Sequence, residues 1–108
     1  MARTATRFAG PAVVGSTAAT KYTVPASSKA VIRHVHISNP SASAVDFTMS
    51  IGTDATGTRI YSGYSISADT VYDHYPYYVV DAAEIIQAFA GTENILTLTI
   101  DGDLLTVG

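Results

Sequence analysis

The sequence predicts an all-β fold, a single antiparallel β-sandwich of the jelly-roll type or immunoglobulin-like without the disulfide, with an extended N-terminal arm. Apolar and polar residues alternate with a period of two from Lys21 onward, which is typical of strands with one buried face. Clusters of Gly, Pro, Asn and Asp interrupt the alternation at intervals of about eight to twelve residues, and no segment has a convincing amphipathic helical pattern. The length of 108 residues suits one domain.

The N-terminal segment differs in composition from the rest of the chain. Residues 1–19 are mostly Ala, Thr and Gly, and Phe8, Val13 and Val14 are their only sizeable apolar side chains. Such a segment cannot form a core alone, and it becomes ordered only on a sheet edge or on a neighbouring surface. We therefore predict an arm over residues 1–19 and a sandwich over residues 20–108.

The first strands follow from the alternation. A strand near 22–24 ends at Pro25, which has no N–H to donate. The segment 30–39 is expected to place Val31 with Val35 and Ile37 on one face, and Ile32 with the two histidines on the other. The segment 45–51 has the cleanest alternation in the chain.

Later strands are expected around 59–61, 66–72 and 77–80. The segment 81–90 suits a helix of two turns or a strand, and the strand is favoured because no capping box precedes it. Residues 94–100 form a further strand, DGD at 101–103 is a hairpin turn signal, and the last strand follows it.

Composition excludes several classes of function. The chain has no Cys, so it has no disulfide framework, thiolate zinc site, iron–sulfur cluster or cysteine nucleophile. It contains no GxSxG elbow, Walker loop or GxGxxG motif. No apolar run is long enough for a membrane span, and the first residues lack the apolar segment of a secretory signal. We therefore expect that the protein is not an enzyme, binds no cofactor and is not a membrane protein.

The charges are few and unevenly distributed. Charged residues make up 14% of the chain, against about 25% in an ordinary domain. The net charge of −3 argues against nucleic acid as a partner. Residues 1–45 hold five basic and no acidic residues, whereas residues 46–108 hold one basic and nine acidic residues. These halves either attract each other, within a molecule or between copies, or are simply solvated.

Two histidines lie two residues apart on one predicted strand. His34 and His36 therefore project from the same face, at a spacing compatible with a shared metal ion that His74 could complete. The alternative is a face that is partly exposed or that packs on a neighbouring subunit. We favour the subunit contact and predict no metal site.

A run of tyrosines, Tyr72, Tyr75, Tyr77 and Tyr78, is the leading candidate for a contact surface. Tyrosine combines a large apolar body with a polar tip and is enriched at interfaces. The alternative is core packing, since alternation would bury about half of these rings. Asp73 and His74 are adjacent on a strand, so they point to opposite faces and cannot easily form a catalytic pair.

The segment KYTVPASSKAVIRHVHISN (21–39) resembles a pattern in small virion proteins of tailed bacteriophages, a YTVPA segment leading into a long strand that ends in Asn. VDFTMSIG, AAEIIQAFAG and LTLTIDG continue the resemblance, which covers residues 20–102. It implies a small β-sandwich module used for capsid decoration or in tails and fibres, and it carries over no catalytic residue. The turn glycine of the pattern is missing at Ala83–Glu84.

From the resemblance and the charge pattern we expect a non-enzymatic structural protein of the virion, assembled in the host cytoplasm. The leading role is a capsid decoration (cement) protein that binds the major capsid protein as a small oligomer of identical subunits, such as a trimer. A tail, fibre or neck component and a glycan-binding adhesion module are the alternatives. The candidate partner-binding residues are Arg3, Arg7, Phe8, His34, His36, Tyr72, Tyr75, Tyr77 and Tyr78.

Overall fold

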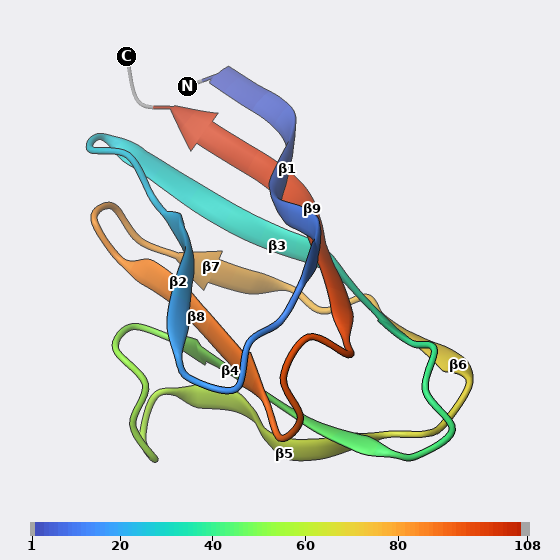
Figure 1. Ribbon diagram of the computed structural model, residues 1–108. Coiled ribbons are helices and arrows are strands. Elements are labelled where there is room, and N and C mark those ends of the chain that lie inside the picture. The colour runs from blue at the N-terminus through green and yellow to red at the C-terminus, as the bar shows by residue number, and fades with distance from the viewer. Residues whose placement is uncertain (1, 107–108) are drawn as a thin grey trace.

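The computed structural model describes residues 2–106, which form two antiparallel sheets packed face to face (Figure 1). The strands are β1 (Ala2–Val13), β2 (Ala19–Thr23), β3 (Ser28–Asn39), β4 (Val45–Ile51), β5 (Arg59–Ile66), β6 (Thr70–His74), β7 (Tyr78–Val80), β8 (Ile85–Ala90) and β9 (Thr97–Thr106). The larger sheet has the order β1-β9-β3-β6, and β7 pairs with β3 beside β6. The smaller sheet has the order β2-β8-β4-β5. The predicted β-sandwich is confirmed.

The strand order is that of a jelly roll. Strands β6 and β7 pair with successive parts of the same edge of β3, so together they act as one interrupted strand. Counted in this way, the fold has eight strands with Greek-key connections, and the chain crosses between the two sheets at every connection except the one from β4 to β5. The segment 81–90 contains a strand and not a helix, as predicted: Ile85–Ala90 is strand β8, which lies between β2 and β4.

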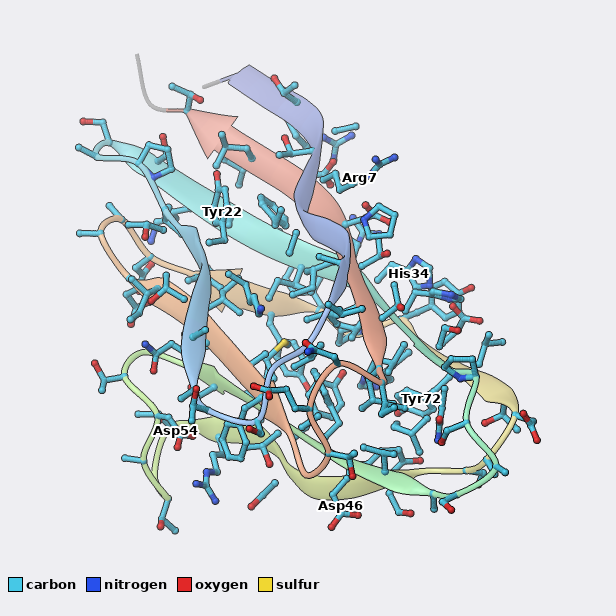
Figure 2. All side chains as sticks on the ribbon, in the orientation of Figure 1. Arg7, Tyr22, His34, Asp46, Asp54 and Tyr72 are labelled. Carbon is cyan, nitrogen blue, oxygen red and sulfur yellow. The ribbon has the colours of Figure 1, made fainter. Side chains whose placement is uncertain are left out.

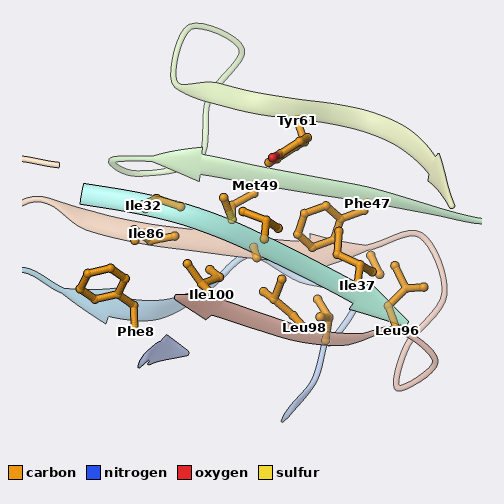
Figure 3. Close-up of a cluster of buried hydrophobic side chains, with 14 of the residues drawn as sticks. Phe8, Ile32, Ile37, Phe47, Met49, Tyr61, Ile86, Leu96, Leu98 and Ile100 are labelled. Carbon is orange, nitrogen blue, oxygen red and sulfur yellow. The ribbon is translucent and has the colours of Figure 1, made fainter. Parts of the chain in front are cut away.

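The core lies between the two sheets, and the period-two pattern fills it as expected (Figure 3). Strand β4 contributes Val45, Phe47 and Met49. Other large, fully buried side chains are Ile32, Val35, Ile37, Ile66, Ile86, Leu96, Leu98 and Ile100. Every buried side-chain nitrogen or oxygen in the described part of the chain has a hydrogen-bond partner.

In the first half of β3, the side chains lie on the faces opposite to those predicted. The pairing of β3 with β9 shifts between Ile32 and His34, so Arg33 is the extra residue of a β-bulge. A bulge moves the residues before it to the opposite face. Ile32 therefore joins Val35 and Ile37 in the core, while Val31 lies on the same face as His34.

The hairpin expected at residues 101–103 is also wrong. These residues lie within β9, paired with β1 on one side and β3 on the other. Gly102 is required for packing and not for a turn: a Cβ there would lie 1.9 Å from the carbonyl oxygen of Val31 and 2.9 Å from the Phe8 ring. The glycine lets the two neighbouring strands approach β9 closely.

The extended N-terminal segment is ordered on a sheet edge, one of the two positions that its composition allows, and forms the edge strand of the larger sheet. Strand β1 pairs with β9 from Ala2 to Val13. Phe8 and Val14 are buried in the core, and the Phe8 ring packs on that of Tyr22 with 4.9 Å between centroids. Residues 1–19 therefore contribute two side chains to the core of the sandwich.

The turn before β8 contains a residue in a strained backbone conformation. Ala83 has a φ of 68°, in the left-handed region, and its N–H donates to the carbonyl of Val24. A side chain in this region costs about 1 kcal/mol relative to glycine. The missing turn glycine is therefore a local cost that the rest of the fold offsets.

We expect Ala83→Gly to raise the free energy of unfolding by about 0.5 to 1 kcal/mol, since relief of the strain exceeds the added entropy of the unfolded chain. Urea denaturation monitored by circular dichroism measures the change. Ala82→Gly is the control, because Ala82 has no positive φ, and it should destabilise the protein slightly. Equal effects of the two substitutions would contradict a strained Ala83.

Candidate functional site

The segment from Val71 to Val80 alternates strictly between the outside of the larger sheet and the interior of the sandwich. Its outward side chains are Val71, Asp73, Tyr75, Tyr77 and Val79, which we call the outer row. The four apolar members are 59%, 73%, 69% and 46% exposed, in that order. They belong to β6, to β7 and to the loop between them, along one edge of the larger sheet. Exposed apolar side chains in a continuous row are typical of a binding surface.

The inward side chains of the same segment close the edge of the sandwich, where β6 and β7 of one sheet lie opposite β5 of the other. Tyr72 packs on Tyr64 of the smaller sheet with 4.9 Å between ring centroids. His74 shares a hydrogen bond with the Tyr61 hydroxyl. The His74 ring lies edge-on to the Tyr78 ring, with 6.5 Å between the ring centroids. Burial raises the pKa of Tyr61 far above its ordinary value, and burial together with Tyr64 raises that of Tyr72.

The tyrosine run is therefore divided into two pairs. Tyr72 and Tyr78 are half-buried and structural, whereas Tyr75 and Tyr77 are exposed. Tyr75 stacks on the ring of His34, with 4.6 Å between centroids and 4° between planes. The guanidinium of Arg33 lies 5.7 Å from the centroid of Tyr77. These contacts hold both exposed rings in place at the surface.

The two histidines of β3 share a carboxylate. His34 Nε2 lies 2.8 Å from Asp73 Oδ1, and His36 Nδ1 lies 2.6 Å from the same oxygen. Hydrogen bonds from His36 and His34 lower the pKa of the Asp73 carboxyl. His74 points to the other side of the sheet, as expected from its adjacency to Asp73, so it is not the third member of this cluster.

The basic and acidic halves of the chain attract each other within one molecule. Arg7 on β1 lies 3.8 Å from Asp101 on β9, and His34 lies 3.7 Å from the same carboxylate. Figure 2 shows Arg7 and His34 on the same side of the molecule. The ion pairs of the described residues are Arg7–Asp101, Lys29–Asp81, Arg33–Asp103 and Arg59–Asp54. Three of the four are on or beside the larger sheet, so its outer face has little unbalanced charge.

The remaining predicted contact residues are distributed unevenly. Arg3 is exposed on β1, and Arg7 is exposed but paired with Asp101. Phe8 is a core residue and is not available to a partner. Val71 and Val79 are exposed contact candidates that were not predicted from the sequence, although the alternation through 71–79 is a signal that points to them.

Comparisons with protein-family models, curated proteins and solved structures give no match for this chain. The described residues contain no helix that is long and apolar enough to cross a membrane.

Proposed function

We propose that this chain is a non-enzymatic structural protein of a tailed-phage particle, a decoration subunit that binds the capsid shell as a small oligomer. The outer row is the observation that carries the proposal. Its apolar side chains are held in a fixed arrangement at the surface, and each is 46% to 73% exposed, so covering it would bury about half or more of its surface and gain on the order of 1 kcal/mol. The resemblance of residues 20–102 to small virion proteins supports the setting in a particle.

The outer row favours contact through side chains over extension of the sheet. Strands β6 and β7 form the free edge of the larger sheet, but residues 75–77 interrupt them. Pro76 in this interruption has no N–H, which disfavours pairing with another strand. The partner, either the capsid shell or an identical subunit, is expected to bury the exposed rings and valines.

The intramolecular ion pairs support close approach of such a partner. Charges that are already balanced repel an identical subunit less than a surface of one sign would. Each exposed pair contributes at most about 1 kcal/mol to stability, so its principal effect is on association. This reassigns the role expected for the N-terminal arm: Arg7 neutralises the face, and the outer row supplies the contact.

The double variant Tyr77→Ser/Val79→Thr tests the contact surface. It removes apolar contact area, and Thr at position 79 keeps a β-branched residue in β7. We expect binding to phage particles assembled without this subunit to weaken by about tenfold to a hundredfold, measured by co-sedimentation. The thermal unfolding midpoint should change little, because both side chains are exposed.

Val13→Thr is the matched control for this experiment. Val13 is 51% exposed, similar to Val79 at 46%, but it lies on β1 at the opposite edge of the larger sheet. The control should bind particles like the parent protein. Unchanged particle binding by the double variant would rule out the outer row as the contact surface.

A glycan-binding adhesion module is the second candidate. The observation in its favour is the exposure of the Tyr75 and Tyr77 rings, which are suited to stacking on sugars. A glycan array separates the two functions. Saccharide binding that is lost in Tyr75→Ala would support adhesion, and silence across the array together with saturable particle binding would support decoration.

A further inference from the structure

Three ligand atoms of the larger sheet converge on one point of its outer face. They come from His34 and His36 on β3 and from Asp73 on β6, and all lie within 4.8 Å of one another. The Asp73 carboxylate contacts Nε2 of His34 at 2.8 Å and Nδ1 of His36 at 2.6 Å. Tetrahedral zinc with bonds of about 2.0 to 2.1 Å needs about 3.3 Å between ligand atoms. The Asp73 oxygen lies closer than this to both ring nitrogens, so it would have to move away from them to admit an ion between the three ligands.

Hydrogen-bonded strands fix the positions of these ligands. His36 and Asp73 are direct partners in the register of β3 and β6, and His34 follows from the period of two on the same strand. The cluster therefore forms on a paired sheet and not on a mobile loop, which lowers the cost of arranging it around an ion.

Neighbouring groups orient the His34 ring. The Tyr75 ring stacks on it with 4.6 Å between ring centroids. Nδ1 of His34 faces the Asp101 carboxylate at 3.7 Å. A metal-bound histidine commonly has a carboxylate at its second ring nitrogen, which selects the tautomer with a free Nε2. That nitrogen is the one directed at Asp73. The three ligand side chains are 26% to 35% exposed, so an ion can reach them from solvent.

We propose that His34 Nε2, His36 Nδ1 and the Asp73 carboxylate bind a divalent transition metal, with Zn²⁺ as the best match. Two imidazoles and one carboxylate suit zinc better than the hard cations Mg²⁺ and Ca²⁺, which prefer oxygen ligands. Three protein ligands leave a fourth position for water or for a group from a bound partner. This site is independent of the decoration role, although Asp73 belongs to the outer row.

Calorimetric titration of the tag-free, chelator-treated protein with Zn²⁺ tests the site. We expect one equivalent to bind, and His36→Gln and Asp73→Asn to weaken binding by more than about tenfold. Asp46→Asn is the matched control, because it makes the same chemical change on an exposed carboxylate of the other sheet, and it should leave binding unchanged.

Imidazole NMR of the parent protein gives a readout that does not depend on the folding of any variant. Zinc should shift the ring signals of His34 and His36 and leave those of His74 in place. No heat at a hundredfold excess of zinc, binding undiminished by His36→Gln, or equal shifts at all three histidines would each overturn the proposal.

Discussion

Gly102→Ala is expected to lower the free energy of unfolding by about 3 kcal/mol or more, the upper part of the range for an overpacked site. The added Cβ would lie 1.9 Å from the carbonyl oxygen of Val31, a distance that no rotamer change relieves. That carbonyl belongs to β3, whose own neighbours hold it in place. The substitution must therefore separate β9 from β3, and it must also displace the Phe8 ring.

Urea denaturation followed by circular dichroism measures this loss, and Gly57→Ala is the control. A Cβ at Gly57 would have no atom within 4 Å, so that variant should differ from the parent by less than about 0.5 kcal/mol. A Gly102→Ala protein as stable as the parent would show that residues 101–103 form a solvated turn and would contradict the central position of β9.

Asn39→Asp is the second substitution with a large expected effect. Asn39 is fully buried at the end of β3, and its Nδ2 donates to the carbonyls of Ile66, Ser43 and Ser67 at 2.9, 3.0 and 3.2 Å. Its Oδ1 accepts from the N–H and the hydroxyl of Ser41. The side chain thus connects the loop after β3 with the turn between β5 and β6.

An aspartate has the same shape but faces three carbonyl oxygens with no N–H to offer them. We expect a loss of about 3 to 5 kcal/mol at neutral pH, as for a buried charge left without its partner. Protonation of the new carboxyl restores one donor, so the loss should be smaller at pH 4 than at pH 7. Thermal unfolding at both pH values measures the two effects.

Asn94→Asp is the corresponding isosteric change at an exposed position, and Asp tolerates the φ of 59° found there. It should change stability by less than about 0.5 kcal/mol. A neutral Asn39→Asp variant would contradict the hydrogen-bond network at the end of β3.

The fold class could be predicted from the sequence because alternation is a local property. The alternation is clearest in the sequence of β4 and correctly places Val45, Phe47 and Met49 in the core, although Thr48 and Ser50 on its other face are buried as well. The errors arise where a strand departs from ideal pairing. The bulge at Arg33 inverts the faces before it, and neither Arg33 nor its neighbours differ in type from ordinary strand residues.

Gly102 and Phe8 show a second kind of limit. A glycine between two aspartates has the composition of a turn, and only the strands on both sides show that it permits close packing. Phe8 is isolated among small residues, so its burial depends on a sheet edge formed by residues about 90 positions later. Both features depend on contacts distant in sequence.

The candidate site was predictable in part. The alternation correctly indicated that half of the tyrosines face inward, and the i, i+2 spacing correctly placed His34 and His36 together. The third member of that cluster is Asp73 and not His74, because the register of β3 with β6 places Asp73 beside His36. Register across strands cannot be obtained from either segment alone.

Saturation binding of the purified protein to phage particles assembled without it tests the decoration role most directly. The proposal predicts a discrete oligomer in solution that saturates the particles at a fixed number of copies, with Tyr77→Ser/Val79→Thr failing to reach that number at the same concentration. A monomer that does not sediment with the particles at any concentration would contradict it.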